Sequence, residues 1–249
     1  MTPDIVATRR DAVLAIGINR PQKRNALSQD MYAAMTALLV QAEGDESVRA
    51  VLFHGLPEAF TSGNDLEDFA QRPPEGQETP VFRFLHTVSA AQKPLVAAVT
   101  GPAIGIGTTL LLHCDLVYAG DNARFAMPFT QLGLVPEFAS SYLLPLVAGY
   151  QRAAELLLLG EAFDAKKAYE AGFVTRVVPA AEALETAWRE AAKLAALPPK
   201  SVRVTKALMK SRHADSVRSQ LAAEGEHFRA MLTEPAARAA FAAFLAKRK

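Results

Sequence analysis

The sequence predicts an α/β fold with a helical C-terminal region. Up to about residue 180, short apolar segments of strand length alternate with segments that carry apolar residues at helical spacing. From residue 181 onward, every segment has helical spacing. This order of elements predicts an α/β core over residues 1–180 and a helical region over residues 181–249.

The predicted strands are short runs of apolar and β-branched residues bounded by turn residues. They cover residues 5–8, 13–18, 48–54, 94–100, 116–119, 124–126 and 174–178. Residues 71–80 contain three prolines and a glycine, a composition that predicts a surface loop.

Helices are predicted where apolar residues recur every three or four positions. Ser28 can cap a helix that runs to about Ala42, because Met31, Met35 and Leu38 share one face. Further helices of the core are predicted at residues 66–70, 81–91, 140–148, 153–159 and 165–171. Those of the C-terminal region are predicted at residues 181–196, 201–212, 216–232 and 235–247.

Charge and composition argue against several classes of function. Basic and acidic residues number 27 and 26, so no net charge attracts nucleic acid or an acidic membrane surface. No basic-then-apolar signal opens the chain, and the most apolar stretch, residues 95–112, is interrupted by glycine and proline. Cys114 is the single cysteine and lies in an apolar run, which indicates a buried, inert thiol in a reducing compartment. We therefore expect a cytoplasmic protein.

Residues 60–66, FTSGNDL, form the first segment that can carry chemistry. Gly63 tolerates backbone angles that turn N–H groups toward a ligand. The alternative is a loop in which Asn64 or Asp65 caps the next helix, and the segment alone favours that alternative.

Residues 101–110, GPAIGIGTTL, form the second segment. Its glycines join a buried strand to a helix, where unpaired N–H groups can hold a phosphate, a carboxylate or an oxyanion. The spacing matches neither a dinucleotide-binding fingerprint nor a phosphate-binding P-loop. Close packing of helix on strand explains the small residues equally well.

The third segment, residues 127–142, contains Glu137 as the single charged residue between Arg124 and Arg152. A carboxyl group in apolar surroundings has a raised pKa, which suits a general acid or base near neutral pH. The alternative is an exposed glutamate in a first helical turn after Pro136, and the residues alone favour it.

Other residues in the sequence are weaker candidates for a functional site. The five histidines lack metal-ligand spacing, so no metal site is predicted, and His113 is expected to be a packed core residue. Arg203, Lys206, Lys210 and Arg212 form one basic helical face, interpreted as a solvated surface or a contact for phosphates.

Together the segments resemble the crotonase (enoyl-CoA hydratase/isomerase) superfamily. The resemblance runs from NRPQKRNAL at residues 19–27 to AGFVTRVV at residues 171–178, and is most specific at GPAIG (101–105), CDLVYAG (114–120) and ARFAMP (123–128). It implies a spiral of ββα units whose C-terminal helices cover the core and mediate a homotrimer or a dimer of trimers. It also implies that coenzyme A is part of the substrate, with no separate cofactor.

The resemblance implies a thioester oxygen held by two backbone N–H groups. These donors correspond to Ser62 and Ile106, the latter between Gly105 and Gly107. The pantetheine and adenine of coenzyme A are expected along Ser62, Gly63, Asn64, Asp65 and Leu66 and beside Gly105, with Lys23 or Arg24 as a phosphate contact.

Within the superfamily, the positions of acidic side chains in the active site determine which reaction is catalysed. Similar hydratases carry glutamates where this chain has Thr109 and Phe129, so hydration is unsupported. Glu137 corresponds to the catalytic glutamate of peroxisomal-type Δ3,Δ2-enoyl-CoA isomerases, which serve fatty acid metabolism. Phe138 is bulky where a small residue is expected and is predicted to narrow the acyl pocket.

The resemblance therefore implies an isomerase that moves a 3-enoyl-CoA double bond to the 2-position. Two alternatives remain open. The chain can be an enoyl-CoA hydratase or another crotonase-type hydrolase or lyase, because one scaffold supports many reactions. It can also be a non-catalytic protein that binds acyl-CoA or serves assembly.

Overall fold

The structure of the chain is a computed structural model that describes residues 2–72, 76 and 78–246. Parts of the predicted loop 71–80, and residue 247 of the last predicted helix, lie outside the described residues. The strands are β1 (Ile5–Arg10), β2 (Val13–Ile18), β3 (Ala50–His54), β4 (Leu95–Val99), β5 (Pro102–Ile104), β6 (Leu116–Gly120), β7 (Arg124–Ala126), β8 (Phe163–Asp164) and β9 (Arg176–Val178).

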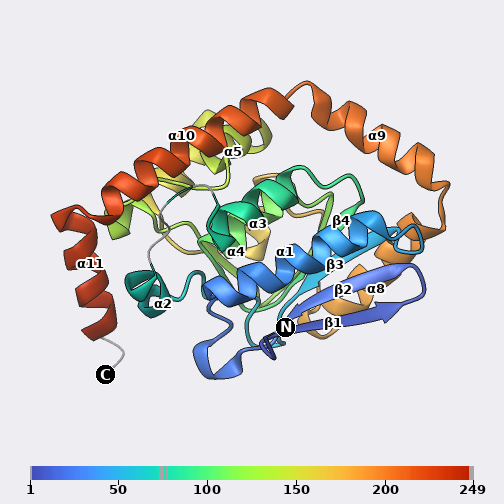
Figure 1. Ribbon diagram of the computed structural model, residues 1–249, viewed down its shortest axis with the longest axis horizontal. Helices are drawn as coiled ribbons and strands as arrows, with labels where there is room; N and C mark the ends of the chain where they lie inside the picture. Colours follow the sequence, from blue (N-terminus) through green and yellow to red (C-terminus); the bar gives the residue numbers. More distant parts are fainter. Residues whose placement is uncertain (1, 73–75, 77, 247–249) are drawn as a thin grey trace.

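Helices make up most of the remainder (Figure 1). They are α1 (Gln29–Gly44), α2 (Leu66–Gln71), α3 (Pro80–Ser89), α4 (Ile106–Thr109), α5 (Ser140–Ala148), α6 (Tyr150–Ala154), α7 (Ala165–Glu170), α8 (Ala183–Ala196), α9 (Pro199–Ser211), α10 (Ala214–Leu232) and α11 (Pro235–Ala246). Short turns of 3-10 helix are η1 (Pro21–Lys23), η2 (Leu110–His113), η3 (Thr130–Leu132) and η5 (Ala180–Glu182), and η4 (Glu155–Leu159) is a π turn.

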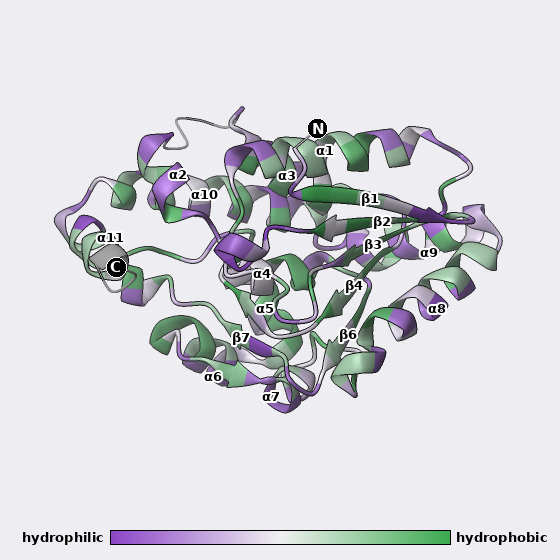
Figure 2. Cartoon of the chain, turned by 90° about the horizontal axis from the view of Figure 1, so that it is seen from below, coloured by the Kyte–Doolittle hydropathy of each residue, from purple (hydrophilic) through white to green (hydrophobic). Residues whose placement is uncertain are grey.

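The larger sheet has the strand order β1-β2-β3-β4-β6-β9. Only the hairpin of β1 and β2 is antiparallel in this sheet, and the other pairs are parallel. A parallel sheet is covered on both faces, which explains why β3 and β4 are continuous apolar runs. The strands are accordingly among the most hydrophobic parts of the chain in Figure 2.

Alternate residues of these strands belong to two separate clusters. Ala50 and Leu52 of β3 pack with Trp188 and Ala191 of α8 on one face of the sheet. Val51 and Phe53 of the same strand face the main core, to which α1 and α3 contribute. The first helix of the predicted C-terminal region thus packs directly on the core sheet.

The smaller sheet, β5-β7-β8, places the loop before α4 beside the larger sheet. In Figure 1, α10 crosses over α5, α11 lies at one end of the molecule, and α9 extends at the other. The α/β core with C-terminal helices confirms the predicted fold class. Among the described residues, no helix combines the length and the apolar character needed to cross a membrane.

The structure corrects one interpretation of the sequence. Lys206, predicted on a solvated basic face, is the buried residue of α9. Its ammonium group donates to Asp115 Oδ2 and to the carbonyl of Lys93, both at 2.7 Å. A lysine is buried when a carboxylate and a carbonyl replace its water, and here both partners lie about a hundred residues earlier in the chain.

Candidate active site

Two of the three predicted segments lie side by side. Thr61 and Ala103 form a parallel bridge, and the N–H of Ile104 donates to the carbonyl of Thr61 at 3.0 Å. Gly63 has a φ of 91°, and a Cβ there would approach the carbonyl oxygen of Ile104 to 3.0 Å, so this close approach favours glycine. Three residues beyond the bridge on each segment, Asn64 and Ile106 line one cavity of about 410 Å³.

Asn64 and Ile106 present unpaired backbone N–H groups. On either side of Asn64, the N–H of Gly63 donates to Thr61 Oγ1 and that of Asp65 to the carbonyl of Leu27. The N–H groups of Asn64 and Ile106 have no acceptor among the described residues. Two unpaired donors beside one cavity can stabilise an oxygen on which negative charge develops.

The structure contradicts the prediction that Ser62 supplies an oxyanion donor. The N–H of Ser62 donates to the carbonyl of Arg24 at 3.1 Å, and its hydroxyl donates to the carbonyl of Lys23 at 3.3 Å. Arg24 has a φ of 49°, a left-handed conformation whose carbonyl reaches residue 62. The free donor of this segment is therefore Asn64, two residues later.

Glu137 lies in the apolar interior with 8% of its surface exposed. It precedes α5 by three residues, so the alternative of an exposed first-turn glutamate is wrong. Its carboxylate accepts a hydrogen bond from the Thr109 hydroxyl. Burial raises the pKa of Glu137 to about 8, partly opposed by the Thr109 hydrogen bond and assisted by the charge of Glu224.

Glu137 faces a small apolar cavity of about 20 Å³ that adjoins the larger one. Asn64, Phe69 and Phe228 line both cavities, and Val81, Phe82 and Leu85 of α3 form much of the inner wall. Phe138, which was predicted to narrow the acyl pocket, lines the inner cavity and stacks on His113 at 4.1 Å between ring centroids. His113 is buried, as expected for a core histidine.

Only some of the remaining predicted binding residues line the larger cavity. Ser62, Gly63, Leu66 and Gly105 line the 410 Å³ cavity together with Asn64 and Ile106. Lys23, Arg24 and Asp65 are not among the described residues that line it.

Asp65 stabilises the local fold instead of lining the cavity. Its carboxylate caps α2 by accepting the N–H groups of Glu67 and Asp68, and it pairs with Arg20 at 2.8 Å. Burial acts to raise the pKa of Asp65, but the Arg20 guanidinium and the cap outweigh it, so the pKa lies below its usual value. Lys23 pairs with Glu67 at 2.6 Å.

Sequence reasoning missed several residues around the cavities. Tyr32 of α1 donates its hydroxyl hydrogen bond to Asn64 Oδ1. Glu224 of α10 is buried beside the turn that carries Glu137. Phe228, Leu232 and Phe241 bring the C-terminal helices into the wall of the larger cavity. Their spacing in the sequence is that of ordinary amphipathic helices, so no local signal marked them.

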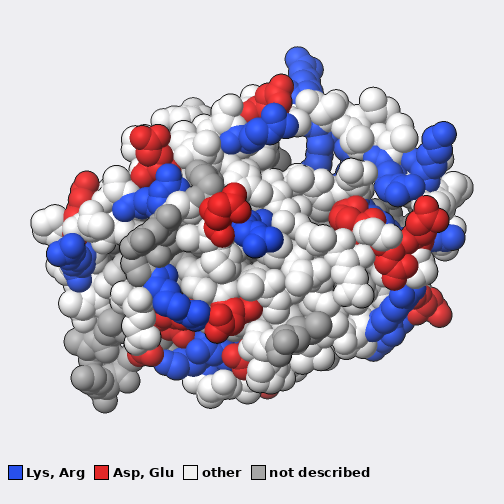
Figure 3. Space-filling model, in the orientation of Figure 1, with Lys and Arg blue, Asp and Glu red and all other residues white. Residues whose placement is uncertain are grey.

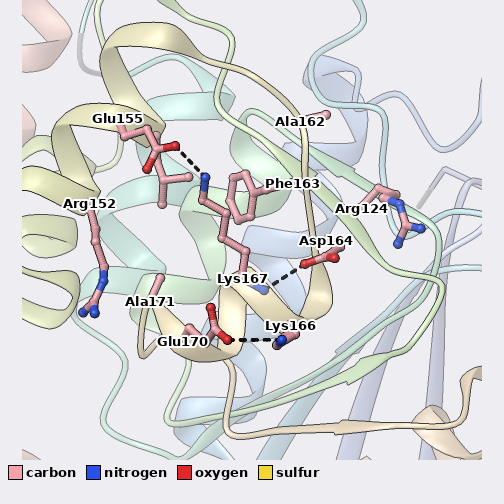
Figure 4. A pocket seen from close by; sticks show the side chains of 11 residues that line it. Arg124, Arg152, Glu155, Ala162, Phe163, Asp164, Lys166, Lys167, Glu170 and Ala171 are labelled. Carbon is pink, nitrogen blue, oxygen red and sulfur yellow. Dashed lines mark hydrogen bonds and ion pairs between the residues drawn. The ribbon is translucent and has the colours of Figure 1, made fainter.

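A cavity of about 710 Å³, larger than the two described above, lies between β7, β8, α6 and α7 (Figure 4). None of the predicted site residues lines it. Its charged side chains largely satisfy one another, since Lys167 pairs with Glu155 at 2.8 Å and Lys166 with Glu170 at 3.8 Å. Within the part of the chain that the structure describes, no three His, Cys, Asp or Glu side chains gather as metal ligands.

The chain is similar to known proteins of one family. The family model described as enoyl-CoA hydratase/isomerase matches residues 8–249. Enoyl-CoA delta isomerase 2 of Rattus norvegicus is 39% identical over 212 residues, which are 83% of this chain and 54% of that protein. The chain thus spans about half the length of that relative.

Two further relatives match almost end to end. The 2,3-dehydroadipyl-CoA hydratase of Escherichia coli K12 is 31% identical over 246 residues, covering 98% of this chain and 96% of that protein. The solved structure of Pseudomonas aeruginosa OdaA superposes with a TM-score of 0.95 at 43% identity, covering 98% of this chain and 99% of that one.

Proposed function

The chain belongs to the enoyl-CoA hydratase/isomerase (crotonase) family, and we propose that it is a Δ3,Δ2-enoyl-CoA isomerase of fatty acid metabolism. The observation that carries this proposal is the composition of the two adjoining cavities. Among the described residues that line them, Glu137 is the single ionisable side chain, and it faces the segment that presents the unpaired N–H of Asn64. One carboxyl group and two oxyanion donors are sufficient for a proton to move along an acyl thioester.

The proposed mechanism uses Glu137 twice. The C2 proton of a 3-enoyl-CoA is acidic because the carbanion delocalises into the thioester carbonyl and the double bond. Glu137 removes this proton while the N–H groups of Asn64 and Ile106 stabilise the dienolate oxygen. The same carboxyl group then delivers the proton to C4, which gives the conjugated 2-enoyl-CoA. No electrons are exchanged, so the reaction requires no cofactor.

The side chains around Glu137 favour proton transfer over addition of water. Hydration needs a base to activate water, and the positions where similar hydratases carry carboxylates hold Thr109 and Phe129. Thr109 instead donates its hydroxyl hydrogen bond to Glu137. Phe129 contributes an apolar wall to the larger cavity. A pKa near 8 for Glu137 suits a group that must both accept and return a proton near neutral pH.

We assign the thioester and pantetheine arm to the 410 Å³ cavity and the acyl chain to the inner one. An inner cavity of about 20 Å³ holds little more than one water molecule. An acyl chain therefore enters when side chains such as Phe82 and Leu85 of α3 move. A homotrimer or dimer of trimers and a cytoplasmic location complete the proposal.

The test is an absorbance assay of wild type and Glu137→Gln with 3-hexenoyl-CoA and with 2-hexenoyl-CoA. We expect wild type to form the conjugated product from 3-hexenoyl-CoA, and Glu137→Gln to lose at least about a hundredfold in kcat, since it cannot accept the proton. Glu226→Gln, an exposed glutamate of α10, serves as the matched control and should behave as wild type.

Other outcomes identify the alternatives. Near-normal turnover by Glu137→Gln refutes the mechanism. Consumption of 2-hexenoyl-CoA with loss of the conjugated absorbance identifies a hydratase. Tight binding of both thioesters without turnover identifies a non-catalytic acyl-CoA-binding protein.

A further inference from the structure

The turn that carries Glu137 has an unfavourable backbone conformation. Phe138 has a φ of 64° and Ala139 a φ of 55°, and neither is glycine. A left-handed conformation costs about 1–2 kcal/mol for a residue with a Cβ, so two in succession persist only where their surroundings hold them. The contacts of this turn therefore determine where the Glu137 carboxyl group points.

One of these contacts comes from the core. The Nε2–H of His113 donates to the carbonyl of Phe138 at 2.8 Å, and the two rings stack. Burial lowers the pKa of His113 to about 3, so this imidazole is neutral near pH 7. His113 thus fixes the ring and carbonyl of Phe138 without adding charge.

The second contact comes from the C-terminal region. Glu224 of α10 is 4% exposed, and its Oε2 accepts the N–H of Ala139 at 2.6 Å. Its Oε1 accepts the N–H of Ser141 at 3.0 Å and also the Ser141 hydroxyl. One carboxyl group thus satisfies backbone donors at the start of α5 and bridges the left-handed turn to α10.

The donors around Glu224 are those of an ionised carboxylate. Three N–H or O–H groups point at its two oxygens, and an ionised carboxylate accepts such bonds without offering a competing proton. Burial raises the pKa of Glu224, and these three bonds act to lower it. The Glu224 charge in turn favours the protonated form of Glu137.

We propose that Glu224 is a positioning residue of the active site, whose carboxylate on α10 holds the turn that directs Glu137 into the cavity. This inference rests on the proposed isomerase function of Glu137. The C-terminal region accordingly takes part in the reaction through a side chain that does not touch the substrate. Its negative charge also makes Glu137 a stronger base.

Two buried titratable groups near the two carboxyl groups do not titrate between pH 5 and 9. Tyr32 of α1 has a pKa raised well above 10.0 by burial, and His113 of η2 has a pKa lowered to about 3. Arg229 of α10 lies over the Phe82 ring of α3, with its Cζ 5.1 Å from the ring centroid. α5 contributes Ser141, which carries no charge. Tyr142 of α5 hydrogen-bonds His213 Nδ1 at the start of α10 at 3.0 Å, so Glu137 has to be followed through a signal that is absent in Glu137→Gln.

The experiment compares Glu224→Gln and Glu224→Asp with the control Glu226→Gln, using 3-hexenoyl-CoA. In Glu224→Gln, one oxygen becomes an NH₂ group that opposes a backbone N–H. We expect kcat to fall about tenfold to a hundredfold with KM changed less than about threefold, because a displaced base slows chemistry more than binding. Glu224→Asp retains the charge and should recover part of kcat.

A second readout does not depend on turnover. The carboxyl stretch of Glu137, identified by its absence in Glu137→Gln, is titrated by infrared spectroscopy in wild type and Glu224→Gln. We expect its midpoint near pH 8 in wild type and at lower pH in Glu224→Gln, because a neighbouring negative charge has been removed. If Glu224→Gln unfolds, Ser141→Ala, which removes one donor, should give a smaller change of the same kind.

The outcomes separate this inference from the proposed function. Wild type that fails to isomerise 3-hexenoyl-CoA refutes the function, and the infrared titration still tests the contact between Glu224 and Glu137. Wild type that isomerises, beside a folded Glu224→Gln with unchanged kcat and an unchanged Glu137 midpoint, refutes the role of Glu224 alone.

Discussion

Glu137 meets two opposing requirements at the scale of a single residue. The proposed base must lose its proton, yet it lies where the charged form is poorly solvated. The Thr109 hydroxyl stabilises the charged form, and Glu224 destabilises it. The balance leaves a pKa of about 8, so a minor fraction of the free protein is ready to accept a proton at pH 7.

This balance predicts how stability changes with pH. The folded-state pKa of Glu137 is about 8, and the ordinary pKa of a glutamate side chain is 4.5. Below pH 4.5 both states are protonated, and as pH rises toward 8 the unfolded chain releases the proton first. The free energy of unfolding therefore falls over this window, by on the order of 5 kcal/mol at about 1.4 kcal/mol per pH unit. In Glu137→Gln, which has no carboxyl group at this position, the free energy of unfolding should not show this fall with pH.

Urea unfolding of wild type and Glu137→Gln at pH 5 and pH 8.5 measures the effect. We expect the variant to gain stability relative to wild type as pH rises, while Glu226→Gln follows wild type throughout. A difference between Glu137→Gln and wild type that stays constant from pH 5 to pH 8.5 contradicts a raised pKa.

The residues alone marked Glu137 as a candidate, and the family resemblance assigned it the role of base. Of the two oxyanion donors that the resemblance gave, Ile106 has a free N–H and Ser62 does not. Glu137 stands out because it is the only charge in a long apolar stretch. The resemblance placed the second donor at Ile106, between Gly105 and Gly107. The donor near Gly63 was misplaced, because which N–H of a loop is free depends on carbonyls elsewhere. Here Arg24 occupies the N–H of Ser62, and no spacing within residues 60–66 indicates that.

Among the elements, every strand of the larger sheet was predicted, since continuous apolar runs are what a sheet buried on both faces requires. The short strands β5 and β8 of the smaller sheet were not predicted. Helix α1 begins after Ser28 as expected, and Ser28 accepts from the N–H of Met31. The helix predicted at residues 153–159 is instead the end of α6 followed by a π turn, a local change of hydrogen bonding that apolar spacing does not encode. Burial of Lys206 was missed because its partner Asp115 is distant in sequence.

Lys206 gives a prediction at the scale of one helix. It is the buried residue of α9 among those described, so its pair with Asp115 fastens this helix to the core. Lys206→Met keeps the apolar stem but leaves Asp115 without its cation. We expect amide exchange in residues 199–211 to accelerate at least about tenfold, with strands β3 and β4 unchanged.

Hydrogen–deuterium exchange read by mass spectrometry measures this change. The matched control is Lys200→Met, an exposed lysine on the same helix. If both variants exchange alike in residues 199–211, the ion pair does not hold α9.

At the scale of the whole molecule, the charged and the apolar parts of the surface suggest different partners. Acidic and basic side chains lie side by side over much of the face in Figure 3, consistent with a net charge of +1 and with no electrostatic attraction to nucleic acid. Part of the exposed apolar surface lies on α9 and α5. Leu208 and Met209 are 70% and 65% exposed, and Leu146 and Val147 about half exposed. A cavity of about 640 Å³ lies between α5, α9 and α10 and is lined by Met209, Leu146 and Val147.

Large exposed apolar side chains around a groove are typical of a surface that another protein covers. Because the family resemblance implies association of identical chains through the C-terminal helices, we expect a second copy of this chain to cover α9.

Light scattering after size exclusion should give about 80 kDa or about 160 kDa, for three or six copies of the 26.8 kDa chain. The double change Leu208→Asp and Met209→Asp should lower the mass to one chain, since it places two carboxylates in an apolar contact. Val40→Asp changes an apolar residue of α1 that is 59% exposed, and it should leave the mass unchanged. A wild-type mass of one chain refutes the assembly, and an assembled double variant places its interface elsewhere.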